Sequence, residues 1–344
     1  MDPIDPVNSR PRHRPCRVQL RYGTLSDDVN MVKHKPERSE RDVIERLRGS
    51  VSLPATGGLV LGIGDDCAIF RPRGSAEDLL FTTDMLIEGV HFLRETHTAA
   101  DIGWKSLARG LSDIAAMGGE PRFCLLSLAL APWSDARWLD SFYRGLLALA
   151  QSAGATLMGG DLARSSKVMA DIVVCGAVPR GKALRRDGAR AGDAIYVSGA
   201  LGGSALGLAT GRGKARQRHL RPEPRLALGQ FLRGKLHATA AMDLSDGLSI
   251  DLHRMCLASG LKAEIAEPPC YPRATLEQAL HGGEDYELLF TAAPRVAVPA
   301  DFEGLPLTRI GTMRKGRKGA VQFRGAPLQP LGYDHFRNDH FHKL

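Results

Sequence analysis

The hexapeptide at residues 243–248, Asp-Leu-Ser-Asp-Gly-Leu, constrains this chain more than any other stretch. The apolar residues 239–242 precede it and a helical apolar pattern at 248–256 follows it, which predicts a strand, an acidic turn and a helix. Ser245 or Asp246 could cap that helix. Because two capping aspartates would be redundant, Asp243 and Asp246 also indicate a cation site. Asp-Gly turns are common, so both interpretations stay open here.

Similar acidic turns recur along the chain. Asp65-Asp66, Asp84 and Asp161 each follow a predicted strand, next to glycine or a hydroxyl residue. Asp113 differs, because it lies among apolar residues of a helix that Thr98 is predicted to cap. A bare carboxylate is costly to bury, so Asp113 requires a cation, a hydrogen-bond donor or the helix's exposed face. Oxygen ligands without His or Cys favour Mg²⁺ shared with phosphates over zinc or iron.

Length and composition limit the class of protein. The 344 residues predict two domains, and 43% hydrophobic with 6% aromatic content is typical of a soluble α/β protein. No apolar run approaches the roughly 18 residues of a membrane span, and the basic N-terminus lacks a signal-peptide core. The six scattered cysteines form no C-x-x-C motif, and most of them lie in apolar segments, which predicts that these are buried free thiols. We therefore expect a cytoplasmic protein without a membrane partner.

The net charge of +8 leaves a basic nucleic-acid-binding protein as an alternative class. Basic residues gather in the N-terminal arm, at 212–225 and at 314–318. None of these segments alternates with aromatic residues as a base-stacking surface would, so we expect solvated loops and tails and no nucleic-acid partner. A steep salt dependence of nucleic-acid affinity would favour the alternative.

Predicted helices and strands alternate along the chain, which indicates an α+β architecture of two α/β domains with mixed sheets. Residues 1–38 lack periodicity and are expected to be a disordered basic extension. The two domains would be residues 39–180 and 181–344, with the polar, glycine-containing segment 181–193 at the boundary. The chain carries no G-x-x-x-x-G-K-[ST] loop and no H-R-D or D-F-G set, so nucleotide binding would depend on carboxylates, metal and glycine turns.

Six ordered motifs carry a family resemblance: GIGDDCA at 62–68, TTDMLIEGVHF at 82–92, LSDIAAMG at 111–118, GGD at 159–161, DLSDGL at 243–248 and GGEDYEL at 282–288. Across residues 39–337 the chain resembles bacterial thiamine-monophosphate kinases. The resemblance implies a two-domain α+β fold and a homodimer whose N-terminal domains join their sheets into a shared barrel. It implies ATP-dependent phosphorylation of thiamine monophosphate to thiamine diphosphate, the last step of that biosynthesis, with several Mg²⁺ ions.

The superfamily also includes aminoimidazole ribonucleotide synthetase, selenophosphate synthetase and a hydrogenase maturation factor, so a different acceptor is the first alternative. A selenophosphate synthetase would require a reactive Cys near a glycine-rich N-terminus, which Cys16 in its Arg- and Pro-rich arm does not resemble. A hydrogenase maturation factor would end in Cys, whereas this chain ends in Leu344.

The resemblance also implies roles for single residues. The implied metal ligands are Asp65, Thr82, Thr83, Asp84, Asp113, Asp161, Asp243 and Asp246. The implied ATP contacts are Tyr143, Gly160, Asp161, Arg186 and Ser245, with Arg185 open as the alternative to Arg186. The implied substrate contacts are His91, Glu284 and Tyr333.

Structural alternatives accompany these roles. Periodicity alone places Tyr143 in a helix core, His91 could be a core or capping histidine, and Glu284 could simply precede a strand. Tyr333 could pack on the core or stack on a flat ring of the substrate. The tail histidines His335, His340 and His342 are expected at a surface rather than at a metal.

The implied acceptor is a phosphate monoester, which is largely a dianion at pH 7 because its second pKa is about 6. We therefore expect direct in-line transfer without a general base and without a phosphoenzyme. Metal ions on the aspartates would offset the repulsion between the two anions. Glu284 could pair with the cationic thiazolium or accept a hydrogen bond from the aminopyrimidine.

Overall fold

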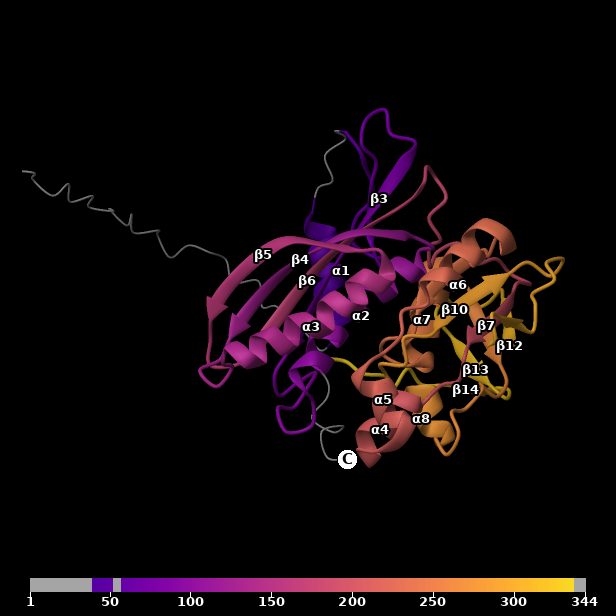
Figure 1. Cartoon of the computed structure of the whole chain (residues 1–344). Coiled ribbons are helices and arrows are strands. Elements are labelled where there is room, and N and C mark those ends of the chain that lie inside the picture. The colour runs from indigo at the N-terminus through magenta and orange to yellow at the C-terminus, as the bar shows by residue number, and fades with distance from the viewer. Residues whose placement is uncertain (1–38, 52–56, 337–344) are drawn as a thin grey trace, which may run out of the picture. The chain divides into compact units, whose positions relative to one another are not determined.

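Two mixed β-sheets organise the computed structural model of this chain, which describes residues 39–51 and 57–336 (Figure 1). Helix α1, Glu40–Ser50, precedes both sheets and begins at Ser39, whose hydroxyl accepts from the Asp42 backbone N–H at 3.2 Å. This start is the one that the sequence predicts. The expected extension 1–38 and the tail residues His340 and His342 lie outside the described residues.

The first sheet has six strands in the order β1-β2-β3-β6-β4-β5. Its strands are β1 (Leu59–Leu61), β2 (Ala68–Phe70), β3 (Glu77–Ile87), β4 (Glu120–Leu130), β5 (Thr156–Arg164) and β6 (Met169–Pro179). β4 and β5 run parallel, and the other neighbouring pairs in this sheet are antiparallel. The sheet is therefore mixed, as predicted.

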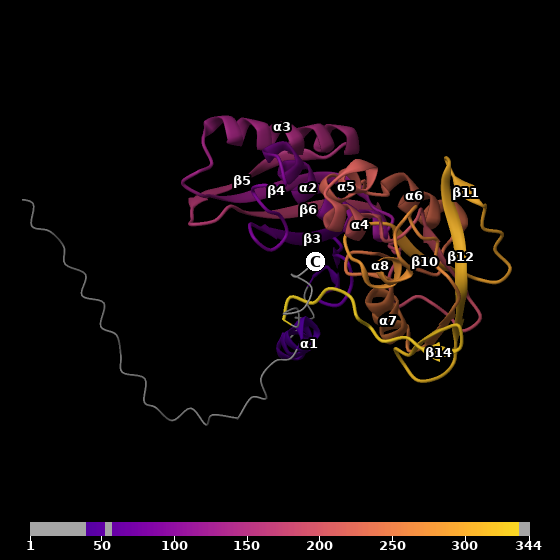
Figure 2. The same cartoon turned by 90° about the horizontal axis from the view of Figure 1, so that it is seen from below.

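Helices α2 (Ala99–Ala116) and α3 (Ala136–Ala153) pack together against this sheet (Figures 1 and 2). α2 begins with a capping box between Thr98 and Asp101, which confirms the predicted cap. A Cβ on Gly145 would lie 1.9 Å from the backbone oxygen of Ala100. Glycine therefore allows the two helices to approach closely.

The second sheet has eight strands, in the order β14-β13-β9-β12-β7-β10-β8 with β11 paired to β12. Its strands are β7 (Ala194–Ser198), β8 (Ala240–Asp243), β9 (Lys262–Ile265), β10 (Leu288–Ala292), β11 (Asp301–Phe302), β12 (Leu305–Arg314), β13 (Val321–Phe323) and β14 (Ala326–Pro327). β13 pairs with β9 in parallel, so this sheet is also mixed. Its helical elements are α4 (Gly203–Thr210), α5 (Gly213–Leu220), α6 (Leu226–Phe231), the π-helical turn η1 (Leu232–Leu236), α7 (Leu248–Ser259) and α8 (Leu276–His281).

Residues 180–193 connect β6 in the first sheet to β7 in the second. The exact domain limits stay a prediction. Hydrogen bonds join the two sheets' layers: the Trp104 indole N–H donates to the Pro222 carbonyl at 2.9 Å, and the Ser112 hydroxyl donates to Asp243 at 2.6 Å. α2 is thus one of the elements that link the two domains.

The basic segment 212–225 corrects one prediction. It contains α5 rather than a solvated loop, and its arginines pair with buried carboxylates. Arg218 and Arg225 approach Glu287 to 2.6 and 2.7 Å, and the Glu287 side chain is fully buried. A buried carboxylate requires such partners, so Arg218 and Arg225 balance the charge of Glu287 in the interior.

The start of α7 corrects a second prediction. Its N-cap is Gly247, which has no side chain to cap with, and neither Ser245 nor Asp246 does so. Instead, the Asp251 carboxylate accepts from the backbone N–H groups of Asp246 and Gly247, both at 3.0 Å. The cap comes from inside the helix, which leaves the Asp246 carboxylate available for another role.

Two further observations concern compartment and class. Among the described helices, none is long and apolar enough to span a membrane. Cys67, Cys124, Cys175 and Cys256 are buried free thiols as predicted, whereas Cys270 is exposed. Cys16 lies outside the described residues.

Candidate active site

Three carboxylates from distant segments meet between the two sheets. Asp66 precedes β2, Asp113 lies on α2, and Asp243 ends β8. Each offers an oxygen, and these oxygens all lie within 4.8 Å of one another. This set, called the carboxylate cluster below, is the group of possible metal ligands that the described residues bring together.

Hydrogen bonds orient the carboxylate cluster. The Thr82 hydroxyl donates to Asp113, and the Ser112 hydroxyl donates to Asp243 at 2.6 Å. The Arg186 guanidinium donates to Oδ1 of Asp66 at 2.6 Å. Oδ2 of Asp66 is buried and has no hydrogen-bond partner among the described residues. A buried oxygen without a donor is costly, so this atom is suited to a cation.

The electrostatics of the cluster lead to the same conclusion. Burial and the neighbouring carboxylates Asp84 and Asp243 raise the pKa of Asp113 well above its ordinary value. Burial, with Asp66 as the largest charge effect, raises the pKa of Asp243 likewise. In their ionised forms these carboxylates would therefore carry more negative charge than their surroundings compensate. Oxygen-only donors with this excess charge fit Mg²⁺.

Three further predicted ligands lie beside arginines. Asp84 is 2.9 Å from Arg109, Asp246 accepts from Arg254, and Asp65 lies 3.3 Å from Arg186. Burial and the adjacent Asp66 raise the pKa of Asp65 to about 7. The guanidinium groups balance part of the charge that these carboxylates bring.

Thr83 and Asp161 are not brought to the cluster. Thr82 faces α2 from β3, so the alternation of a strand turns Thr83 to the opposite face, where its hydroxyl donates to Asp171 at 2.7 Å. Asp161 lies within β5, not in a turn after it, and its register partner is Ser127 on β4. Ser127 is in turn the register partner of Asp171. The predicted acidic turn at Asp161 is therefore wrong, because the strand continues to Arg164.

A cavity of about 660 Å³ extends from the carboxylate cluster. Asp84, Asp113, Asp243, Ser245 and Asp246 line its acidic end. The three residues expected to hold the substrate, His91, Glu284 and Tyr333, line the same cavity. The Tyr333 backbone N–H donates to the Asp246 carbonyl at 3.0 Å, which joins the C-terminal segment to the acidic turn.

At the far end of the cavity, the negative charge of a carboxylate is balanced by a lysine. Lys105, whose side chain is fully buried, lies 2.8 Å from Oε1 of Glu284 and 3.0 Å from its Oε2. This cation is the largest charge effect on Glu284 and holds its pKa down at about 2, although burial alone would raise it. Nδ1 of His219 is 3.3 Å from the same carboxylate. Burial lowers the pKa of His219 to about 3, so its ring is neutral.

His91 also enters the cavity wall as a neutral ring. Its Nδ1 accepts from the Ile87 backbone N–H at 3.0 Å, so the proton of the neutral imidazole is on Nε2. Burial lowers the pKa of His91 to about 3. Its ring lies 5.1 Å from that of His335, centre to centre. His335 therefore belongs to the cavity, whereas the sequence predicted only a tail surface.

Sequence reasoning missed Lys105, Arg109, Ser112 and His219. A signal was present for two of them, because Asp101, Lys105, Arg109 and Asp113 recur every four residues along α2. This spacing places charges on one helical face, which is unusual for a helix with so many buried residues. Asp66 was recognised in an acidic turn, but only Asp65 was carried into the ligand set.

The remaining ATP-contact candidates have local structural explanations. Tyr143 is half-buried on α3, packed edge-on against Phe142 at 5.7 Å. A Cβ on Gly160 would lie 1.7 Å from the Leu126 carbonyl oxygen, so glycine permits the pairing of β5 with β4. Local packing and strand pairing thus explain both residues, and their contact with a nucleotide stays a prediction.

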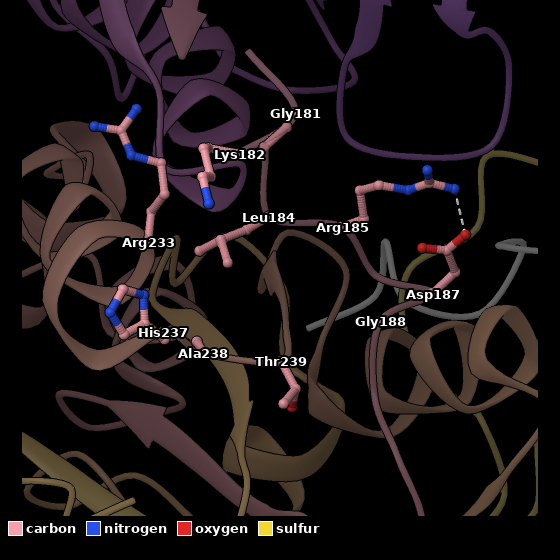
Figure 3. A pocket seen from close by; sticks show the side chains of 11 residues that line it. Gly181, Lys182, Leu184, Arg185, Asp187, Gly188, Arg233, His237, Ala238 and Thr239 are labelled. Carbon is pink, nitrogen blue, oxygen red and sulfur yellow. Dashed lines mark hydrogen bonds and ion pairs between the residues drawn. The ribbon is translucent and has the colours of Figure 1, made fainter. Parts of the chain in front are cut away.

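The two adjacent arginines point to different places. Arg186 reaches the carboxylates of Asp65 and Asp66, whereas Arg185 pairs with Asp187 and lines a separate cavity of about 340 Å³ (Figure 3). Figure 3 shows Lys182 and His237 at that second cavity. The geometry therefore favours Arg186 as the residue of this pair that faces the active site.

Comparison with known proteins identifies the family. Residues 64–180 match the model for the N-terminal domain of AIR synthase related proteins, and residues 190–324 match the model for their C-terminal domain. The thiamine-monophosphate kinase of Escherichia coli (strain K12) is 40% identical over 304 residues, which cover 80% of this chain and 92% of that one. The chain belongs to the thiamine-monophosphate kinase family.

Solved structures of the family agree with this fold. AaThiL complexed with AMPPCP and TMP has a TM-score of 0.77 and 32% identity, covering 87% of this chain and 97% of that one. Thiamine-monophosphate kinase from Stenotrophomonas maltophilia K279a has a TM-score of 0.69 and 39% identity, covering 83% and 96%. The thiamine-monophosphate kinase family thus shares the two-domain α+β architecture described above.

Proposed function

We propose that this protein catalyses the ATP-dependent phosphorylation of thiamine monophosphate to thiamine diphosphate, the last step in making that cofactor. The observation that carries the proposal is one cavity with an acidic, oxygen-only end and a polar, aromatic end. The acidic end suits cations bound to phosphates, and the other end suits the rings of the acceptor. Family membership, and a relative complexed with AMPPCP and TMP, support the same reaction.

The carboxylate cluster would hold Mg²⁺. Asp66, Asp113 and Asp243 supply the oxygens, and Thr82 and Ser112 keep two of the carboxylates in place. Asp65, Thr83, Asp84, Asp161 and Asp246 remain proposed as further ligands. Bound Mg²⁺ would neutralise the phosphate oxygens and align donor and acceptor.

The chain's own groups then need only to bind the two substrates and orient them. The acceptor phosphate is largely ionised at neutral pH, so no residue has to remove a proton. His91 and His219 lie along the cavity but are neutral, with pKa values lowered to about 3, and neither is required as a base. Arg186 is a fixed cation beside the cluster that is suited to a phosphate oxygen. Tyr143, Gly160, Asp161 and Ser245 remain proposed nucleotide contacts.

We also propose that the protein is a homodimer in which the six-stranded sheets form a shared barrel. Met85, Leu125, Met158 and Leu162 on these strands are 48%, 38%, 64% and 59% exposed. Apolar side chains exposed together on one sheet support burial against a partner. Sedimentation equilibrium of the full chain tests this, and a monomer at all micromolar concentrations would contradict it.

The deciding experiment is a coupled assay of ADP release with thiamine monophosphate, ATP and Mg²⁺. Free thiamine and aminoimidazole ribonucleotide precursors serve as control acceptors. We expect Mg²⁺-dependent turnover with thiamine monophosphate alone. Absence of that turnover in correctly folded protein would refute the proposed function.

The acidic turn offers a sharper test. Asp246→Asn should keep the fold, because Asp251 rather than Asp246 caps α7. We expect it to lose most activity, on the order of 100-fold in kcat, as one phosphate-binding metal loses a ligand. Circular dichroism checks the fold, and a near-normal rate would remove Asp246 from the site.

A further inference from the structure

A second cavity lies beside the segment that connects the two sheets. Its volume is about 340 Å³, and it is lined by residues 181–185, 187, 188, 233 and 237–239. None of these residues lines the larger cavity at the carboxylate cluster. The proposed reaction gives the second cavity no role, so its chemistry requires a separate explanation.

Positive side chains predominate in the lining of the second cavity. Lys182, Arg185 and Arg233 are cations, and Asp187 is the single carboxylate of the lining, so two positive charges are in excess. Asp187 pairs with Arg185 (Figure 3). Arg233 reaches Glu120, outside the lining, at 3.5 Å, and the Glu120 side chain is 45% exposed. Lys182 has no carboxylate partner among the described residues. The lining therefore attracts an anion.

Two arginines of the lining carry a buried nitrogen that has no hydrogen-bond partner among the described residues. These nitrogens are Nε of Arg185 and Nη1 of Arg233. The Arg233 side chain is 11% exposed, so solvent reaches little of it. A buried donor without an acceptor costs about 1–3 kcal/mol, and more when the group is charged. An anion with several oxygens would supply the acceptors that these guanidinium groups lack.

Apolar side chains complete the lining. Leu184 and Ala238 are 7% and 9% exposed, and both belong to the core cluster that includes Leu232 and Leu236. Charges beside apolar surface attract each other more strongly than charges in water, because the effective dielectric constant is lower. The volume is near the lower end of the roughly 300–1,000 Å³ of small-molecule sites. The cavity is therefore suited to a small anion.

We propose that the second cavity binds the phosphate group of a small molecule through Lys182, Arg185 and Arg233. A phosphate dianion matches the excess of two positive charges, and its oxygens satisfy the unpaired guanidinium nitrogens. A carboxylate would bring one charge and two oxygens, so it fits the lining less well. The inference goes beyond the proposed function and does not depend on it, because binding is measured without turnover.

The connecting segment links this site to the active site. Arg185 lines the second cavity, and the next residue, Arg186, donates to the carboxylate cluster. The Arg185 carbonyl accepts from the backbone N–H of Ala241 on β8 at 3.3 Å. A phosphate that joins Lys182 to Arg233 would fix the backbone from which Arg186 extends. Occupancy of the second cavity thus bears on the position of an active-site cation.

The first experiment measures phosphate binding without metal. The full-length protein is titrated with inorganic phosphate at pH 8 in EDTA by isothermal calorimetry. Without Mg²⁺ the carboxylate cluster repels an anion, whereas the second cavity requires no metal. We expect one phosphate per chain with a Kd of about 1 mM. Absence of binding in EDTA would overturn the inference, whatever the catalytic activity of the protein.

Lys182→Gln tests whether this binding is at the second cavity. The change leaves no carboxylate unpaired, so the fold should be unchanged. We expect phosphate to bind about 10-fold more weakly, since one charge-assisted contact is lost. The matched control is Lys235→Gln, because Lys235 is also exposed but does not line the cavity. Its affinity should stay at the wild-type value. Equal weakening in both variants would show general attraction to a positive surface and would overturn the inference.

Hydrogen exchange locates the phosphate without any mutation. Phosphate in EDTA should slow the exchange of backbone amides in residues 181–188 and 237–239, which line the second cavity. Slowing confined to the active-site motifs at 62–68 and 243–248 would place the phosphate there instead, and would overturn the inference.

The same titration distinguishes the sources of the phosphate group. Thiamine diphosphate and ADP are compared with inorganic phosphate and pyrophosphate, all in EDTA. Tighter binding of an organic phosphate that Lys182→Gln weakens would identify that compound as the occupant, and equal binding of all four would identify the free anion. Both results support a phosphate site at the second cavity. Affinities that Lys182→Gln leaves unchanged would place every ligand elsewhere and overturn the inference.

Discussion

The two ends of the active-site cavity treat buried charge in opposite ways. At one end, burial and mutual repulsion raise the pKa values of Asp113 and Asp243. At the other, Lys105 holds the pKa of Glu284 at about 2 in spite of burial. The shifts are opposite because Lys105 contacts both carboxylate oxygens of Glu284, whereas the partners shown for Asp113 and Asp243 are the neutral hydroxyls of Thr82 and Ser112. The first end is therefore suited to bind cations from solution, whereas the charge of Glu284 at the second end is balanced by the chain itself.

The largest expected effect comes from the carboxylate cluster, at Asp113, whose partner is a hydroxyl rather than a cation. Asp113→Asn should lower kcat by about 1,000-fold, equivalent to roughly 4 kcal/mol in the barrier, through loss of a ligand that no neighbour can replace. Without Mg²⁺ the variant should be more stable than wild type, because it removes a carboxyl group whose ionised form burial and the neighbouring carboxylates disfavour in the folded state. ADP release and thermal unfolding in chelator measure both effects. Asp140→Asn, on the exposed face of α3, is the control and should change neither.

The next largest effect is expected where the charge of Glu284 is balanced by Lys105. Lys105→Met should destabilise the protein by about 3 kcal/mol, since it leaves the partly buried Glu284 carboxylate without its cation. Urea unfolding monitored by fluorescence measures the loss. Lys262→Met removes an equally short but more exposed pair and should have no measurable effect on the same curve. Equal losses in the two variants would contradict the distinction between the two kinds of pair.

The smallest effect is a pH dependence of the metal-free protein. The pKa of Asp65 is raised from 3.8 to about 7 in the folded state, so its folded form binds protons more readily than the unfolded chain. Stability from such a group is present below pH 3.8 and is lost as pH rises through about 7. We expect the melting temperature without Mg²⁺ to be about 3 °C lower at pH 8 than at pH 6. Saturating Mg²⁺ should remove or reverse this slope, and a slope unchanged by Mg²⁺ would argue against metal at the cluster.

Local sequence signals predicted much of the scaffold. The capping box at Thr98 and the apolar periodicity behind it were sufficient for α2, and Ser39 for α1, because caps and periodicity act within a few residues. The same signals gave two wrong predictions. They assigned the cap of α7 to Ser245 or Asp246, whereas Asp251 supplies it, and they predicted that β5 ends before Asp161, whereas it continues to Arg164. In both cases a local rule had several acceptable outcomes, and packing selected one of them.

By itself, the sequence determined the class of site: oxygen-only motifs at the ends of strands and on one helix, in the order that the thiamine-monophosphate kinase family uses. Tertiary structure alone decided which carboxylates meet, Asp66 with Asp113 and Asp243 but not Asp161. It also decided that Lys105 pairs with Glu284, 179 positions away. Local periodicity cannot encode such a contact, because it depends on how two sheets and the helix between them pack. The charge balance that distinguishes the two ends of the cavity follows from that packing.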